Sequence, residues 1–312
     1  MVIDHNGQRV YLLGDPHLGK TFIHGVPLHR RGEREKLVWK DFEEALQVEC
    51  DLHVCLGDLF DKWMVSYDII LKTAFAYIKA AAEKPQTQFY VLKGNHDWIR
   101  DLERKSAFDL FEAIVSYTDN IHVITQPTQE GGLLFYPWHP SLVAKEEVVR
   151  FSGVEICFGH FDTEFSEHNM VPTGCGIPVI YTGHVHKPEK FIRDNTEVIV
   201  VGSMQPYAHG EEANDDLYIT VTLDQLDDVD TKNKCVRVLL DEDEILDREI
   251  ECLQLTIKRT GKGNDDDAPT VTIGEFDMDA LFRQAFNEVG VLPEITEKVL
   301  AQYHARRVAD GT

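Results

Sequence analysis

Five short blocks of the sequence combine a glycine with side chains that bind metal ions. They are Gly14-Asp15-Pro16-His17-Leu18-Gly19, Gly57-Asp58-Leu59-Phe60-Asp61, Gly94-Asn95-His96-Asp97, Gly159-His160 and Gly183-His184-Val185-His186. Their candidate ligands are carboxylates, an amide and imidazoles, with no thiolate. Such a set suits manganese, iron or zinc in five- or six-coordinate sites and does not suit a structural zinc site.

The number of candidate ligands exceeds what one ion needs, although few of them are carboxylates. This predicts two adjacent ions that share a bridging aspartate. The pairs Asp15/His17 and His184/His186 are two residues apart, so both members of each pair point to the same side of an extended backbone. Paired ions clamp a phosphoryl group and supply a nucleophile derived from water. The blocks therefore predict phosphoester hydrolysis.

Short apolar runs rich in β-branched and aromatic residues alternate with amphipathic segments over the first two thirds of the chain. The runs predict buried strands at Val10–Leu13, Leu52–Leu56, Gln88–Leu92, Leu133–Tyr136, Val154–Phe158, Val179–Tyr181 and Val198–Val201. The amphipathic segments predict helices at Arg34–Glu49, Tyr67–Glu83 and Ser106–Tyr117. This alternation predicts a layered α/β core, with the ligands gathered at the carboxyl ends of the strands.

The pattern changes after Asp216, where alternating strands are expected at Leu217–Leu223, Cys235–Leu240 and Leu253–Lys258. A loop rich in glycine and aspartate follows, and then two amphipathic helices at Leu281–Val289 and Glu294–Val308. We therefore expect a catalytic domain over residues 1–225, a small β cap segment over 226–272 and a helical tail over 273–312.

The charge is strongly acidic, with a formal net charge of −23 over 312 residues. Residues 211–312 carry 25 acidic and 11 basic residues. This balance disfavours a broad, sequence-independent DNA-binding surface, which needs clustered lysine and arginine. One local exception is the basic segment Lys20–Lys40, in which Arg30 and Arg31 are the candidate DNA contacts.

The composition is that of a globular protein, with 43% hydrophobic and 27% charged residues. No run of about 18 apolar residues predicts a membrane span, and the first residues lack the pattern of a secretory signal. The six cysteines form no CxxC pair, as expected for reduced thiols. We expect a cytoplasmic protein that does not bind membranes.

The five blocks, in this order, resemble those of the calcineurin-like metallophosphoesterases, over about residues 8–216. Within that superfamily, His17-Leu18-Gly19 and Gly57–Asp61 resemble the SbcD-type DNA repair and recombination nucleases. Tyr136-Pro137-Trp138, and Val201-Gly202-Ser203 with the Gly-Glu-Glu stretch that follows it, are most similar to the phage recombination-nuclease subunit. The implied fold is a layered β-sandwich flanked by helices, with a small β cap and C-terminal helices.

The resemblance also implies a role for each residue. One ion would be held by Asp15, His17 and His186, the other by Asn95, His160 and His184, and Asp58 would bridge them. His96 would be the histidine that stabilises or protonates the leaving oxygen. Asp61 and Asp97 would orient the ligands. The activating ion of the family is usually Mn²⁺, with Mg²⁺, Fe²⁺ or Zn²⁺ as alternatives.

The function that this resemblance implies is a DNA exonuclease or endonuclease acting in DNA repair and recombination. The resemblance also implies that ATP hydrolysis comes from a separate SbcC-type coiled-coil ATPase, which the C-terminal helices could bind. A homodimer through the helices Tyr67–Glu83 and Ser106–Tyr117 is also implied. If a phage encodes the chain, its location would be the host cytoplasm.

Two other functions stay open. One is a small-molecule or cyclic-nucleotide phosphodiesterase. A protein phosphatase is disfavoured, because phosphatases of this superfamily have a glutamate in place of Asp97 and Val-Asp-Arg-Gly in place of Leu59-Phe60-Asp61-Lys62. The other is a non-catalytic assembly module in which the metal site is structural.

Overall fold

Alternate residues of one early strand contact two different hydrophobic cores. Val10 and Leu12 belong to a core shared by two sheets, whereas Leu13 packs into a second core with helices. This period of two is what a strand produces when both of its faces are covered. In the computed structural model, which describes residues 1–99, 101, 104–211, 217–260 and 296–300, the strand is β2 (Gln8–Leu13).

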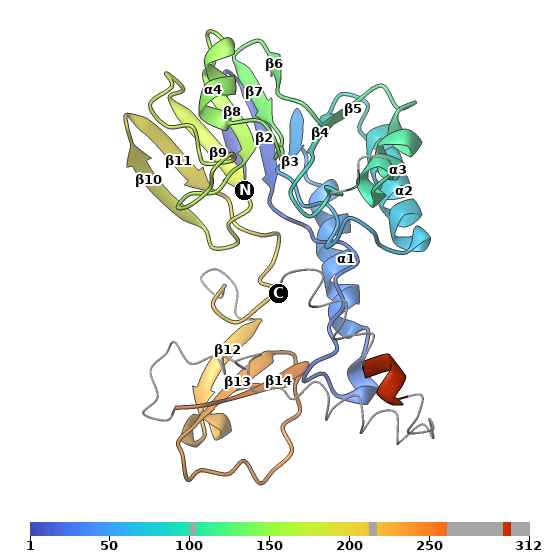
Figure 1. Ribbon diagram of the computed structural model, residues 1–312, viewed down its shortest axis with the longest axis vertical. Helices are drawn as coiled ribbons and strands as arrows, with labels where there is room; N and C mark the ends of the chain where they lie inside the picture. Colours follow the sequence, from blue (N-terminus) through green and yellow to red (C-terminus); the bar gives the residue numbers. More distant parts are fainter. Residues whose placement is uncertain (100, 102–103, 212–216, 261–295, 301–312) are drawn as a thin grey trace. The chain divides into compact units, whose positions relative to one another are not determined.

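The strands of the first two thirds form two sheets (Figure 1). The first has the order β1 (Val2–His5), β2, β3 (Leu52–Cys55), β4 (Gln88–Leu92) and β5 (Ile121–Ile124). The second has the order β10 (Glu189–Arg193), β11 (Thr196–Val200), β9 (Val179–Gly183), β8 (Ile156–His160), β7 (Leu133–Tyr136) and β6 (Thr128–Glu130). Strands β2 to β5 run parallel, as do β7, β8, β9 and β11, which is typical of sheets with both faces buried.

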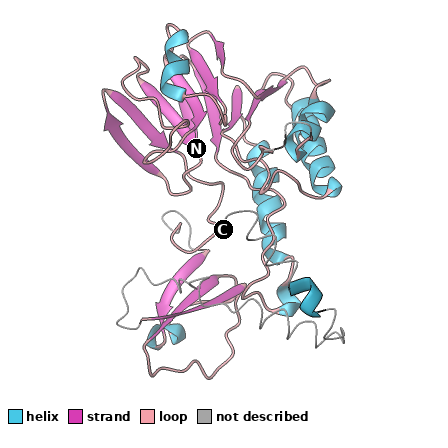
Figure 2. Ribbon diagram, in the orientation of Figure 1, coloured by secondary structure: helices cyan, strands magenta, loops and turns pink. Residues whose placement is uncertain are grey.

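The two sheets pack face to face and helices cover their outer faces (Figure 2). Buried side chains of β2, β3 and β4 meet those of β7 and β8 in the central core. The outer helices are α1 (Glu33–Leu46), α2 (Tyr67–Glu83) and α3 (Ala107–Val115) on the first sheet and α4 (Ala144–Glu147) on the second. This arrangement is the layered α/β sandwich that the sequence predicts.

A separate three-stranded sheet follows, which we call the small sheet. Its parallel strands are β12 (Tyr218–Thr222), β13 (Cys235–Leu240) and β14 (Gln254–Arg259). It begins inside the range 1–225 expected for the catalytic domain and ends inside 226–272. Short 3-10 helices complete the described elements: η1 (Leu28–Arg30), η2 (Val148–Arg150) and η4 (Asp224–Asp227).

The chain divides into two compact units, residues 1–260 and 261–312. Of the second unit the structure describes residues 296–300, which are helical, so the expected helix Leu281–Val289 lies outside the described residues. Within the described part of the chain, no helix has both the length and the apolar character that a membrane crossing requires.

Candidate metal centre

The five sequence blocks lie at or directly after the carboxyl ends of strands β2, β3, β4, β8 and β9, and their side chains meet in space. Ligand atoms of His17, Asp58 and His96 lie within 4.8 Å of one another, and so do those of Asp58, His160 and His184. Asp58 is therefore common to two groups of potential ligands. This is the arrangement that a bridging carboxylate between two ions requires.

His160 directs an unprotonated nitrogen at two oxygen atoms. Its Nδ1 lies 2.8 Å from the carbonyl oxygen of Leu56, which can only accept, so Nδ1 carries the proton. The opposite nitrogen, Nε2, then presents a lone pair 2.9 Å from Oδ1 of Asn95 and 3.4 Å from Oδ2 of Asp58. Three acceptors that face one another attract a cation.

His184 repeats this arrangement from the next strand. Its Nε2 donates to Oδ1 of Asp162 at 2.8 Å, and its Nδ1 lies 2.8 Å from Oδ1 of Asn95. The carboxylate partner fixes the tautomer and leaves the lone pair of Nδ1 directed at the amide oxygen. Asn95, His160 and His184 thus form one half of the centre.

The other half is built around His17 and His186, whose Nε2 atoms lie 2.9 Å apart. Nδ1 of His186 donates to Oε1 of Glu211 at 3.1 Å, which again leaves the inner nitrogen with a lone pair. Oδ2 of Asp58 lies 3.8 Å from Nε2 of His17. Asp15 accepts a hydrogen bond from the backbone N–H of His184 at 2.9 Å.

Two carboxylate oxygens of this site are buried and have no hydrogen-bond partner among the described residues: Oδ1 of Asp15 and Oδ2 of Asp58. Both residues are at most 1% exposed. An uncompensated buried carboxylate oxygen is costly unless a cation binds it. Together with the inward lone pairs, these oxygens fit a site for two divalent ions.

The surroundings shift the pKa values of Asp15, Asp58 and His17. Burial, and then the neighbouring Asp58 carboxylate, raise the pKa of Asp15 above its usual value. Burial alone would raise the pKa of Asp58 too, but the surrounding histidines outweigh it and lower that pKa. Burial lowers the pKa of His17 to about 3. His17 is therefore neutral near pH 7 and can offer a lone pair to a cation.

Three ligands occupy backbone conformations that residues with a side chain seldom adopt. The φ angles are 46° at His17, 48° at Asp58 and 75° at His184. The glycine before Asn95 has a different role, because a Cβ atom on Gly94 would lie 2.1 Å from the backbone nitrogen of Asp58. The glycines in these blocks thus allow two ligand-bearing loops to approach each other closely.

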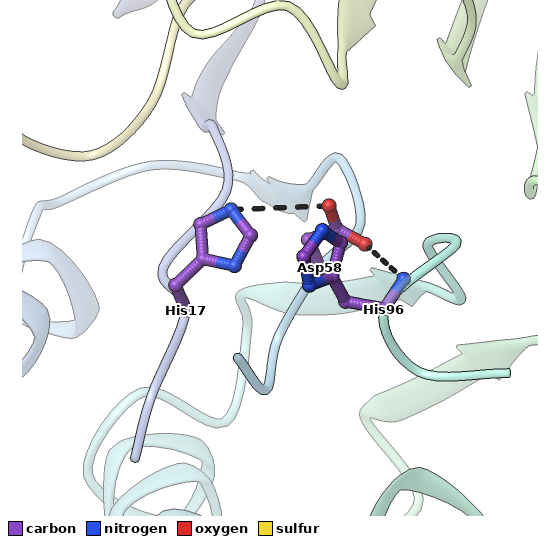
Figure 3. Close-up of side chains that lie close together, drawn as sticks. All are labelled: His17, Asp58 and His96. Atoms are coloured by element: carbon purple, nitrogen blue, oxygen red, sulfur yellow. Dashed lines mark hydrogen bonds and ion pairs between the residues drawn. The ribbon is translucent and has the colours of Figure 1, made fainter. Parts of the chain in front are cut away.

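His96 is exposed and lies close to Asp58 and His17, as Figure 3 shows for these three side chains. Its backbone N–H donates to Oδ1 of Asp58 at 2.8 Å, while Nδ1 of its ring lies 2.7 Å from the carbonyl oxygen of Asp61. The carboxylate of Asp61 pairs with Lys20 at 3.1 Å. The ring of His96 is thereby oriented through Nδ1, and its Nε2 remains able to carry a proton.

Asp97 binds backbone rather than ligand side chains. Its carboxylate accepts from the N–H groups of Leu59 at 3.2 Å, Phe60 at 3.0 Å and Gly94 at 2.9 Å. Burial, and then the charge of Asp58, raise its pKa to about 8, although these N–H groups lower it. Asp97 therefore joins the loop that carries Asp58 to the loop that carries Asn95.

The two arginines expected to contact DNA are not part of this cluster. Arg30 donates to the carbonyl oxygen of Lys232, to Oδ1 of Asn233 at 3.0 Å and to Glu33 at 2.8 Å. Its guanidinium therefore links η1 to the loop before β13. Arg31 is exposed beside it.

Three residues of the site were not identified from the sequence. Asp162 and Glu211 are the carboxylate partners of His184 and His186. Tyr207 packs edge-on against His17, with ring centroids 5.3 Å apart. Asp162 follows His160 by two residues, and Glu211 lies in the Gly-Glu-Glu stretch, so spacing could have suggested both. Tyr207 carries no such signal.

A cavity of about 640 Å³ adjoins the centre on the His184 side. Its wall includes Asp162, which contacts His184, and the exposed ring of Phe165. The other lining residues are Thr163, Glu164, Val185, Lys187, Pro188 and Glu189. The cavity has the volume to hold the organic part of a phosphoester.

Comparison with known proteins identifies the domain. No curated protein sequence matches this chain significantly. The phosphopantetheinyl hydrolase PptH of Mycobacterium tuberculosis is similar in structure, with 13% identity, a TM-score of 0.33, and coverage of 64% of this chain and 93% of that one. The nuclease MPE of Pseudomonas putida is also similar, with 14% identity, a TM-score of 0.30, and coverage of 67% and 93%.

The family model described as calcineurin-like phosphoesterase matches residues 8–219, which hold all five blocks and every strand of the two sandwich sheets except β1. That range is well over half of the chain. The chain belongs to the calcineurin-like phosphoesterases.

Proposed function

We propose that this protein is a nuclease that hydrolyses phosphodiester bonds of DNA at a centre of two divalent ions, with Mn²⁺ as the activating ion. The observation that supports it most directly is the position of Asp58, shared by two groups of potential ligands. The family hydrolyses phosphoesters at a dinuclear metal centre. DNA as substrate is supported by the resemblance of His17-Leu18-Gly19 and Gly57–Asp61 to the SbcD-type nucleases.

Each half of the centre would hold one ion. Two ions bound there would neutralise the charge of a phosphoryl group and lower the pKa of water. The ligands of one ion would be Asp15, His17 and His186, those of the other Asn95, His160 and His184, and Asp58 would bind both. Asp162 and Glu211 would keep the histidine lone pairs directed inward.

His96 would supply the proton for the leaving oxygen. Its Nδ1–H is held by the carbonyl of Asp61, so Nε2 is the nitrogen through which the protonated ring would deliver a proton. The exposed position of the ring at the edge of the cluster allows it to reach a bound phosphodiester. A sugar oxygen is a poor leaving group unless it is protonated, and an oriented acid contributes about 10²- to 10⁴-fold in rate.

The cavity beside His184 favours a second candidate, a phosphodiesterase acting on small molecules. Three carboxylates, those of Asp162, Glu164 and Glu189, line it against the single ammonium of Lys187. Such a lining suits an uncharged group, such as a nucleoside, better than a further phosphate. A small phosphodiester could therefore occupy the centre and the cavity together.

Cleavage of end-labelled linear DNA, single-stranded and double-stranded, tests the proposal in Mn²⁺ and in EDTA. We expect cleavage that requires Mn²⁺ and is absent in Asp58→Asn. Hydrolysis of a nitrophenyl phosphodiester without any DNA cleavage would instead favour the small-molecule enzyme. Metal binding without turnover of either substrate would favour a non-catalytic assembly module.

We also propose that the protein forms a homodimer through α2 and α3. Three large apolar residues recur at four-residue spacing on α2 and are exposed: Tyr67 by 76%, Leu71 by 42% and Phe75 by 60%. Leu110 on α3 and Tyr117 just after it are exposed by 38% and 92%. A continuous apolar face of this kind is typical of a protein interface.

The third part of the proposal is an SbcC-type ATPase as partner. It is supported by the resemblance of the five blocks to those of the SbcD-type nucleases. The helical tail expected to bind it, residues 273–312, lies almost entirely outside the described residues. Co-purification of full-length chain with such an ATPase, compared with a chain lacking residues 275–312, would test this part.

A further inference from the structure

We infer that Tyr207 is a positioning residue for one half of the metal centre, and that it makes this half depend on the small sheet. The half concerned is that of Asp15, His17 and His186. The inference rests on the proposed metal centre. It is carried by a continuous series of hydrogen bonds from the ligand loop to β12.

The side chain of Tyr207 is attached to the loop that carries two of the ligands. Its hydroxyl donates to the carbonyl oxygen of Pro16, the residue between Asp15 and His17. Its ring packs edge-on against the ring of His17 at an interplanar angle of 88°. Because φ of His17 is 46°, this loop has a conformation that needs external support. The tyrosine supplies that support from inside the protein, where it is 5% exposed.

The backbone of Tyr207 is linked to the third ligand, His186, through the carboxylate of Glu211. Its N–H donates to Oε2 of Glu211 at 2.8 Å, and Oε1 of the same carboxylate accepts from Nδ1 of His186 at 3.1 Å. Glu211 therefore orients the histidine and is itself held by the tyrosine backbone. One residue thus fixes the position of all three ligands of this half.

Tyr207 is also hydrogen-bonded to the small sheet. Its carbonyl oxygen accepts from the hydroxyl of Tyr218, the first residue of β12, at 2.9 Å. Arg34 on α1, which is 1% exposed, donates to the carbonyl oxygen of Pro206 at 3.1 Å and to the Tyr218 hydroxyl at 3.4 Å. A displacement of β12 would therefore pull on Tyr207 and, through it, on the ligand loop.

The ligands of the other half are Asn95, His160 and His184. Among the described residues they have no such hydrogen-bonded link to the small sheet. His160 is held by the carbonyl oxygen of Leu56, and His184 is held by Asp162. Leu56 follows β3 and Asp162 follows β8, so both supports belong to the sandwich. We therefore expect that a change at the small sheet alters the affinity for one ion and leaves the other unchanged.

The test measures Mn²⁺ binding to the full-length chain by titration calorimetry, in wild type, Tyr207→Phe and Tyr218→Phe. Tyr207→Phe should weaken one of the two ions about 10-fold or more, the usual effect of losing a group that orients a ligand. Tyr218→Phe should act on the same ion by a smaller factor. Asp162→Asn should weaken the other ion, which shows that the two binding steps can be told apart.

Tyr90→Phe is the matched control, because the hydroxyl of this buried tyrosine donates to Oε2 of Glu130 at 2.6 Å, away from the centre. Metal-free Tyr207→Phe should unfold within a few degrees of Tyr90→Phe, and Tyr90→Phe should bind both ions as wild type does. Wild-type affinities in Tyr207→Phe, or an equal loss at both ions, would overturn the inference. Wild-type protein that binds no Mn²⁺ would overturn the proposed centre itself.

Discussion

The Nε2 atoms of His17 and His186 lie 2.9 Å apart, although the residues are separated by 169 positions in the sequence. Glu211 accepts a hydrogen bond from the opposite nitrogen of His186, and burial keeps His17 neutral. Two imidazole nitrogens so close together cannot both be protonated. One proton shared as a hydrogen bond joins them in the metal-free protein, and a cation that binds both lone pairs would replace that proton.

Asp58→Asn should abolish the binding of both ions. The amide removes the negative charge common to the two groups of ligands while it keeps the size of the side chain. We expect hydrolysis to fall by at least about 10³-fold, since several kcal/mol of charge stabilisation is lost. Metal content by mass spectrometry, with kinetics on the same sample, is the measurement. Two ions retained per chain would contradict the bridging role.

His96→Gln should keep both ions and lose turnover. The ring is oriented by Asp61 and is placed to protonate the leaving oxygen, so we expect a loss of about 10²- to 10⁴-fold with DNA. A nitrophenolate leaves without protonation, so a nitrophenyl phosphodiester should lose much less. Steady-state kinetics with both substrates checks this. An equal loss on the two substrates would show that His96 does not act as the acid.

Asp97→Asn should destabilise the protein and weaken the metal centre. The three N–H groups of Leu59, Phe60 and Gly94 would lose one acceptor oxygen to an NH₂ group. Leaving buried donors unpaired costs about 1–3 kcal/mol. Urea unfolding in EDTA and Mn²⁺ titration measure the two effects. Asp109→Asn is a useful comparison, because that carboxylate pairs with Lys93 and caps α3 rather than holding a ligand loop.

His53 should make the stability of the metal-free protein depend on pH. It is fully buried next to the rings of Tyr11 and Phe89, and burial lowers its pKa to about 3. Below about pH 6.5 the unfolded chain binds a proton here and the folded chain does not. The contribution is therefore fully present above pH 6.5 and is lost as the pH falls toward 3, by about 1.4 kcal/mol per pH unit.

The measurement is urea unfolding of wild type and His53→Leu in EDTA at pH 7 and pH 5. The free energy of unfolding should fall between these two pH values by about 2 kcal/mol less in the variant. All other titrating groups are common to both proteins. Equal falls would show that the folded protein protonates His53 in this range.

Phe75→Glu should convert the proposed dimer into a monomer. The side chain belongs to the exposed apolar row of α2 and is 60% exposed, so a charge there would be buried unpaired in the interface. Sedimentation equilibrium gives the mass, and Lys40→Glu, on the exposed surface of α1 and paired with Glu44, is the control. A wild-type monomer at micromolar concentration would reject this interface.

The candidate ligands could be recognised from the sequence because they lie in short local blocks, and the structure brings them together. A glycine and a ligand after an apolar strand are visible without any structure, and the resemblance assigns each block a role. The same holds for the sandwich: α2, β4, β7 and β13 begin and end where their patterns predict. Short edge strands such as β1 and β10 were missed, because few of their residues are buried.

The sequence by itself determined the family, the layered fold and the set of atoms that can hold the ions. Only the tertiary structure showed that Arg30 contacts the loop before β13, and that Asp162, Glu211 and Tyr207 hydrogen-bond to candidate ligands or to the loop that carries them. The physical reason is that a ligand is encoded by its own residue type and its place after a strand. Its hydrogen-bond partner is chosen by packing between distant segments, for which the sequence carries no local pattern.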